Sequence, residues 1–187
     1  MLKTDLTNAL ITLKNQGVIA YPTESVFGLG CDPDSEVALN KILQIKQRSA
    51  HKGLILIAAN SEQLQNYADF SQLNEIQITR IQSTWPGPVT WIVPAKSTLH
   101  PLITGHFKSV AVRVSAHPLV SELCLMFNKP IISTSANLSG LEACQTATQV
   151  EEMFLNSPLL GTILRASVGK SDSPSKIYDA LSGERLR

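Results

Sequence analysis

The chain has 187 residues, of which 43% are hydrophobic and 17% are charged, and its formal net charge is +1. This length and composition predict one globular domain, residues 1–187, whose core needs no disulfide or metal support. The near-neutral charge excludes a surface that binds nucleic acid through its overall charge, although it is compatible with a local basic cleft. The three cysteines are widely separated, which excludes a disulfide framework.

The sequence shows no signal for secretion or for a membrane. Residues 1–5 lack the basic and then apolar order of a signal peptide, and no apolar run reaches the length of a membrane span. We therefore expect a cytoplasmic protein without a membrane partner.

The first elements are a helix and a buried strand. Thr4 is the expected cap of a helix over 5–16, and Gly17 stands at its C-terminal capping position. The apolar run 18–21 predicts a strand that ends at Pro22, because proline cannot donate to a sheet.

The rest of the chain continues this alternation. Asp34 or Ser35 opens a second helix that runs to Arg48. The further expected elements are a strand at 53–59, a short helix at 60–67, a helix at 74–83, a strand at 89–93, a long loop at 94–108, a strand at 110–114, a helix at 117–127, a strand at 130–133, a helix at 149–155 capped by Thr146 or Thr148, and strands at 161–166 and 177–181. Because 90–114 contains two strands joined by a loop, we expect an α/β domain with a mixed sheet.

A polar triplet follows the first strand, where α/β folds place ligand-binding residues. Thr23 and Ser25 supply hydroxyls and Glu24 supplies a carboxylate, while Gly28 and Gly30 allow close approach of the backbone. An ordinary strand-to-turn connection is the alternative that the triplet alone leaves open.

Four cations stand out from their surroundings. Lys46, Arg48 and Lys52 follow one another at the exit of the second helix, which suits a polyphosphate. A solvated helix end, favoured by the helix dipole, is the alternative. Arg113 interrupts the apolar run 110–114, and a buried arginine requires a partner or a ligand. Its alternative is a solvent-facing position on an edge strand.

Two later loops, 133–137 and 173–175, are rich in hydroxyl groups, which suit phosphate oxygens and the neutral parts of a ligand. The motifs GxxxxGK[ST], GxGxxG at the start of a helix, HExxH and GxSxG are absent. An activated nucleophile and tight metal binding are therefore disfavoured, whereas a pocket for an anionic ligand is favoured.

Five motifs, in order and over nearly the whole chain, resemble those of the YrdC family. They are Tyr21-Pro-Thr-Glu-Ser with Gly28-Leu-Gly30, Lys46-x-Arg48, Trp85-Pro-Gly-Pro-x-Thr90, Val112-Arg113-Val114 and Ser133-Thr-Ser-Ala-Asn137-x-Ser-Gly140. The length is similar to that of the single-domain bacterial members. The resemblance implies an open, twisted, mixed α/β sheet with a positively charged concave face. It also implies a nucleotidyltransferase, an L-threonylcarbamoyladenylate synthase, that converts L-threonine, bicarbonate and ATP to threonylcarbamoyl-adenylate and pyrophosphate.

The resemblance implies a two-part site. On the threonine side it implies Ser25, Arg113, Ser133 and Ser175, with Thr23 and Thr90 shaping the pocket. On the ATP side it implies Lys46, Arg48, Lys52, Ser109, Ser135 and Asn137, of which the first three are implied as catalytic. Two departures from the family pattern are visible, because Ser25 stands where relatives often carry threonine, and Lys170 and Ser171 stand where they often carry an arginine.

The resemblance also implies the other components of the reaction. Mg²⁺ is implied only as the ion that accompanies ATP, without a dedicated protein metal site. Partner proteins are implied to transfer the threonylcarbamoyl group to the adenosine beside the tRNA anticodon. Two other hypotheses remain open, namely direct binding of tRNA or double-stranded RNA by a basic concavity, and carbamoyl transfer as in the hydrogenase-maturation proteins that share the fold.

Overall fold

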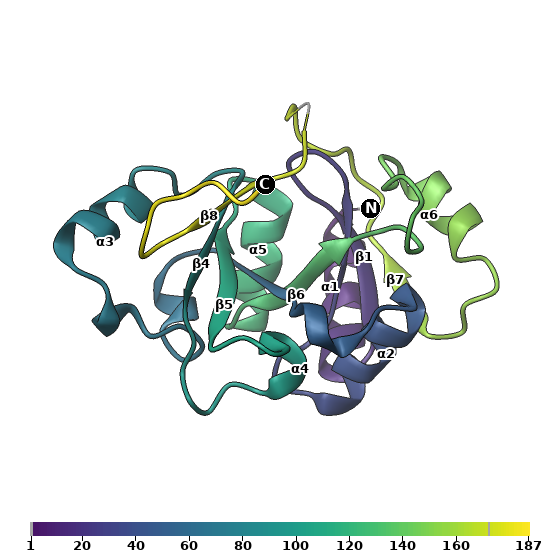
Figure 1. Cartoon of the computed structure of the whole chain (residues 1–187). Helices are drawn as coiled ribbons and strands as arrows, with labels where there is room; N and C mark the ends of the chain where they lie inside the picture. The colour runs from purple at the N-terminus through teal and green to yellow at the C-terminus, as the bar shows by residue number, and fades with distance from the viewer. Residues whose placement is uncertain (1, 172) are drawn as a thin grey trace.

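The computed structural model describes residues 2–171 and 173–187, and the strands in these residues form one sheet in the order β7-β1-β2-β6-β3-β5-β4-β8 (Figure 1). The strands are β1 (Val18–Pro22), β2 (Phe27–Gly30), β3 (Ile55–Ala58), β4 (Val89–Pro94), β5 (Ser109–Val114), β6 (Ile131–Ser135), β7 (Leu160–Ile163) and β8 (Lys176–Asp179). Three neighbouring pairs are parallel, β7 with β1, β3 with β5 and β4 with β8, and the others are antiparallel. The expected mixed α/β sheet is confirmed.

Helices cover both faces of the sheet. They are α1 (Leu2–Lys14), α2 (Glu36–Lys46), α3 (Glu75–Gln82), α4 (Pro101–Thr104), α5 (Pro118–Phe127) and α6 (Ala147–Met153), with 3₁₀ turns η1 (Ala50–Lys52), η2 (Glu62–Leu64) and η3 (Phe70–Gln72). In Figure 1, α1 and α5 lie behind the sheet and α2 lies in front of it. Leu13 and Leu123 of the rear helices pack with Ile19, whereas Ile42 of α2 belongs to the same core as Val18. Successive residues of β1 therefore enter opposite cores, as the alternation of side chains along a strand requires.

Most of the expected helices and strands are present with shifted ends. Ser35 caps α2 and Thr146 caps α6, while Asn74 caps α3 with both hydrogen bonds of a capping box. The expected cap Thr4 is wrong, because α1 begins at Leu2 and Thr4 lies inside it. Likewise, the left-handed residue after α1 is Gln16, with φ of 57°, and not Gly17.

Two other expectations are wrong between these elements, and one strand was not predicted. Residues 60–67 form only the turn η2 instead of a helix, and the loop 94–108 contains the short helix α4. β2 is a strand that the sequence did not predict. A Cβ atom on Gly30 would lie 2.7 Å from the Tyr21 ring and 2.8 Å from the carbonyl oxygen of Ile132, so the packing of β1, β2 and β6 requires glycine there. Among the described helices, none is both long and apolar enough to cross a membrane.

Candidate functional site

A cavity of about 370 Å³ lies over one face of the sheet. Its floor is a row of paired strand residues, in which Ile55 of β3 lies between Ser133 of β6 and Ala111 of β5, and Ala111 also pairs with Ile92 of β4. Ile57, two residues beyond Ile55 on the same face, packs in the core of α1 and α5. The cavity therefore occupies a part of this face that those two helices leave uncovered.

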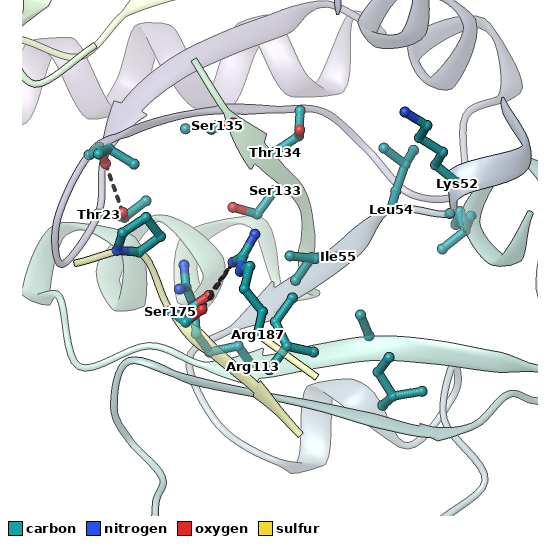
Figure 2. A pocket seen from close by; sticks show the side chains of 18 of the residues that line it. Thr23, Lys52, Leu54, Ile55, Arg113, Ser133, Thr134, Ser135, Ser175 and Arg187 are labelled. Atoms are coloured by element: carbon teal, nitrogen blue, oxygen red, sulfur yellow. Dashed lines mark hydrogen bonds between the residues drawn. The ribbon is translucent and has the colours of Figure 1, made fainter. Parts of the chain in front are cut away.

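Four cationic side chains line the cavity, namely Arg48, Lys52, Arg113 and Arg187. Figure 2 shows Arg113 and Arg187 beside each other near Ser175, with Lys52 at the opposite end of the view. Burial and the charge of Arg113 lower the pKa of Arg187, and burial and the charge of Arg187 lower the pKa of Arg48. The described lining includes no Asp or Glu side chain, so an anionic ligand is the partner within the cavity that would neutralise these groups.

Arg113 is buried in the sheet. Its residue is 7% exposed, and β5 lies between β3 and β4, so the alternative of a solvent-facing edge position is wrong. Its Nη2 atom lies 3.6 Å from Oε2 of Glu24, a separation that gives an ion pair without a hydrogen bond. The other carboxylate oxygen of Glu24 accepts hydrogen bonds from the hydroxyl of Ser115 at 2.8 Å and from the backbone N–H of Ala116 at 3.1 Å.

Lys46 lies in the wall behind the cavity. Its ammonium donates to the carbonyl oxygens of Ser135 and Asn137 and to the side-chain oxygen of Asn137, each at 2.6 Å. The Ser135 hydroxyl donates to the same Asn137 oxygen at 2.6 Å. Burial and then the charge of Arg48 lower the pKa of Lys46 to about 8. These contacts tie the end of α2 to the end of β6 and fix the backbone from which Ser135 enters the cavity.

Hydroxyl groups meet at the arginine end of the cavity. Ser175 lies 3.1 Å from the hydroxyl of Thr90, measured between the two oxygen atoms, and it accepts from Arg187 at 3.3 Å. Thr23 donates its hydroxyl to the carbonyl oxygen of Val26 at 2.7 Å, which closes the turn between β1 and β2 and leaves Ser25 at the cavity.

Most of the implied site residues come together in this structure. Those that line the cavity are Thr23, Ser25, Arg48, Lys52, Ser109, Arg113, Ser133, Ser135 and Ser175. Lys46, Thr90 and Asn137 do not line it, but each is hydrogen-bonded to Ser135 or Ser175. Lys170 is exposed and does not line it either.

Sequence reasoning missed Arg187. Its side chain reaches the cavity because the C-terminal segment folds back beside β8, where the N–H of Leu186 donates to the carbonyl of Ile177 at 2.8 Å and the N–H of Ile177 donates to that of Arg187 at 3.1 Å. The two cations Arg185 and Arg187 were the available signal, but charge alone does not predict this return.

No group of three or more His, Cys, Asp or Glu side chains that could hold a metal is present in residues 2–171 and 173–187. Since the described cavity lining also lacks Asp and Glu side chains, it suits the phosphates of a nucleotide better than a bare cation.

Residues 12–187 match the model of the Sua5/YciO/YrdC family, which is described as "Telomere recombination". The chain is 60% identical to a threonylcarbamoyl-AMP synthase of Psychromonas ingrahamii over 99% of this chain and 97% of the relative. It is 55% identical to one of Serratia proteamaculans over 97% of this chain and 94% of the relative.

A solved structure shows the same fold. A P. abyssi Sua5 complexed with L-threonine superposes with a TM-score of 0.86 at 30% identity, covering 96% of this chain and 51% of the Sua5 chain. The chain thus spans about half the length of that archaeal protein, whereas it spans nearly all of the bacterial relatives.

Proposed function

This chain belongs to the Sua5/YciO/YrdC family, as its motifs indicated, and we propose that it is a threonylcarbamoyl-AMP synthase. The reaction joins L-threonine, bicarbonate and ATP into threonylcarbamoyl-adenylate, with release of pyrophosphate and water. The observation that supports this best is the convergence of Arg48, Arg113 and Arg187 on one cavity whose described lining contains hydroxyls but no Asp or Glu side chain. Two anionic substrates, an amino acid and a triphosphate, match that lining.

The two substrates take opposite ends of the cavity in this proposal. Arg113 binds the carboxylate of threonine through its planar fork, and Ser133 and Ser175 supply hydroxyls beside it. Arg48 and Lys52, with Ser109 and Ser135, bind the phosphates. Lys46 and Asn137 act from behind by fixing the backbone of Ser135.

The reaction needs no nucleophilic side chain. The amine of threonine combines with bicarbonate to give a carbamate and water, and an oxygen of that carbamate attacks the α-phosphorus of ATP while the bond to pyrophosphate breaks. The protein excludes water, holds the reactants in line and neutralises the developing charge. Mg²⁺ would be held by the triphosphate itself, because the described lining offers it no Asp or Glu side chain, and it would neutralise charge on the leaving pyrophosphate.

The product is a reactive mixed anhydride, so it requires a prompt acceptor. We propose that partner proteins transfer its threonylcarbamoyl group to tRNA beside the anticodon and that this takes place in the cytoplasm. A basic cavity of this size also leaves direct binding of RNA as an outcome to be tested.

The proposed function is tested by leaving each component out of the reaction mixture in turn. The protein is incubated with ATP, L-threonine, bicarbonate and Mg²⁺, pyrophosphate is measured, and each component is left out in turn. We expect pyrophosphate only in the complete mixture. Pyrophosphate release that does not depend on threonine and bicarbonate, or salt-dependent RNA binding without any turnover, would contradict the proposal.

A further inference from the structure

The buried carboxylate of Glu24 lies directly behind the arginines of the cavity. Glu24 is 8% exposed and Arg113 is 7% exposed, so both charges of this pair are largely removed from water. Glu24 does not itself line the cavity, whereas Arg113 does. Glu24 therefore acts on a ligand without touching it, through its charge and through its hold on Arg113.

The two oxygens of Glu24 have different surroundings. Oε1 accepts from Ser115 and Ala116. Oε2 is buried without a hydrogen bond and lies 3.6 Å from Nη2 of Arg113, and Nε of Arg113 is also buried without a partner. One oxygen thus anchors the carboxylate, and the other provides negative charge beside the guanidinium while leaving its N–H groups available to a ligand.

The backbone of Glu24 is also held in place. Its carbonyl oxygen accepts from the N–H of Ser171 at 3.0 Å, and Gly169 donates to the neighbouring carbonyl of Thr23 at 2.8 Å. A Cβ atom on Gly169 would lie 2.7 Å from the Glu24 carbonyl oxygen, so this segment packs tightly on the turn. These contacts fix the position from which the Glu24 side chain starts, and the bonds from Ser115 and Ala116 to Oε1 hold the carboxylate itself beside Arg113.

The excess of positive charge around the cavity indicates what the Glu24 carboxylate does beside Arg113. Arg48, Arg113 and Arg187 converge on the cavity, and Glu24 forms an ion pair with one of them, Arg113. We infer that Glu24 is a positioning residue that limits the positive potential at Arg113 and thereby lowers the affinity of the cavity for small anions, the carboxylate of a substrate included. This inference rests on the proposed function, because it takes the carboxylate of threonine as the ligand of Arg113.

The direction in which ligand affinity changes when Glu24 loses its charge distinguishes this electrostatic role from a purely structural one. Glu24→Gln keeps an oxygen that can accept from Ser115 and Ala116 but removes the negative charge. If Glu24 only held the fold, this substitution would weaken ligand binding. If Glu24 limits the potential at Arg113, sulfate and L-threonine bind more tightly, by roughly tenfold for loss of one nearby charge in a partly screened site.

Calorimetric titration of the whole chain with sulfate and, separately, with L-threonine tests the inference. The matched control is Asp32→Asn, which removes a carboxylate from another partly buried ion pair, with Lys129 at 2.7 Å, outside the cavity. We expect tighter binding of both ligands in Glu24→Gln and unchanged binding in Asp32→Asn. Sulfate affinity that is unchanged or weaker in folded Glu24→Gln overturns the inference.

A second variant covers the case in which Glu24→Gln does not fold. Ser115→Ala removes a hydrogen bond to Glu24 but keeps the charge, so sulfate affinity should stay within about twofold of the parent, while a tenfold gain would overturn the inference. Threonine binding tests the proposed function, and sulfate binding tests the role of Glu24 independently. If the parent protein fails to bind threonine, the proposed function fails, whereas the sulfate titrations still decide whether Glu24 limits the potential at Arg113.

Discussion

Arg187 donates hydrogen bonds to Ser175, reaching its carbonyl oxygen at 3.0 Å and its hydroxyl oxygen at 3.3 Å. The Ser175 hydroxyl in turn lies 3.1 Å from that of Thr90. The C-terminal segment and the loop before β8 therefore hold each other at the edge of the cavity, and Figure 2 shows both side chains directed into it. A cation from the end of the chain thus becomes part of a site whose other members come from the sheet.

Replacement of Arg187 by alanine should impair turnover without unfolding the protein. The substitution removes one of three guanidinium groups and frees Ser175, and loss of one charged donor in such a site typically reduces the rate by about 10²–10³-fold. Steady-state pyrophosphate release measures the effect. Lys176→Ala is the control, because this exposed cation lies on β8 next to Ser175 and does not line the cavity. Equal activity of the two variants would show that Arg187 has no part in the reaction.

Arg48→Ala should lower turnover by a similar factor and weaken ATP binding more than threonine binding. Arg48 lines the cavity and its Nη2 atom donates to the carbonyl of Gly53 at 2.9 Å, so the guanidinium is already held in position for phosphate. Separate titrations with ATP and with L-threonine measure the loss of affinity for each substrate. Lys14→Ala, an exposed cation at the end of α1, should leave both affinities unchanged. An Arg48→Ala protein with normal ATP affinity would contradict the assignment.

Arg113→Lys should bind threonine at least about tenfold more weakly, because an ammonium cannot replace a planar fork on a carboxylate. The shorter reach of lysine also leaves Glu24 without its partner at 3.6 Å, so some loss of stability is expected. Calorimetry with L-threonine, and with ATP as the internal reference, measures this effect. A parallel loss of both affinities would indicate a general collapse of the cavity instead of a threonine-specific role for Arg113.

The sequence predicted those elements whose signals are local. Ser35, Asn74 and Thr146 each accept from the backbone at a helix start, and such caps can be recognised from residue type and spacing. β2 gave no such signal, because two of its four residues are glycines, and Gly30 is required only by the close packing of Tyr21 and the backbone of β6. Its place in the sheet depends on tertiary contacts and not on β-propensity.

In the candidate site too, some features could be predicted from local sequence and others depend on the fold. Ser133 and Ser135 both line the cavity as alternate residues of β6, but the sequence predicted that this strand ends at 133, so it did not predict their shared face. Lys46 and Arg48 could not be told apart by residue type, yet one is bonded to backbone oxygens in the wall and the other lines the cavity. That difference arises from the left-handed backbone of Gln47 between them, with φ of 48°, which turns the chain at the end of α2.

The lowered pKa of Lys46 predicts a pH dependence of stability. Burial lowers this pKa to about 8 in the folded protein, whereas an unfolded lysine titrates near 10.4. Between these values the unfolded chain binds more protons, so the contribution of Lys46 to the free energy of unfolding increases with pH, by at most about 1.4 kcal/mol per pH unit. Below about pH 8 both states are protonated and this contribution is flat.

Denaturant unfolding between pH 7 and pH 10 measures this slope as a difference between the parent and Lys46→Met. The difference should grow in favour of the parent as the pH rises above about 8. The control is Lys14→Met, which removes an exposed lysine. The difference in free energy of unfolding between the parent and this variant should not change with pH. Parallel curves for the parent and Lys46→Met would show that the buried ammonium keeps an ordinary pKa.

Gly105→Ala should destabilise the protein and weaken nucleotide binding together. Gly105 has φ of 65°, and a Cβ atom there would overlap the carbonyl oxygen of His51. The close approach of Gly105 to His51 brings η1 against the segment after α4. The rings of His51 and His106, one from each segment, stack there with centroids 4.0 Å apart. Because Lys52 and Phe107 line the cavity from these two segments, separating them moves both.

Gly140→Ala is the control for Gly105→Ala, since its φ is also positive, at 88°, but nothing lies within 4 Å of a new Cβ atom. Backbone strain alone should cost about 1 kcal/mol at Gly140, whereas strain and overpacking together should cost at least about 2 kcal/mol at Gly105. Denaturant unfolding and ATP titration measure both effects. If the two variants lost equal stability and kept equal ATP affinity, the close approach of Gly105 to His51 would have no role in shaping the cavity.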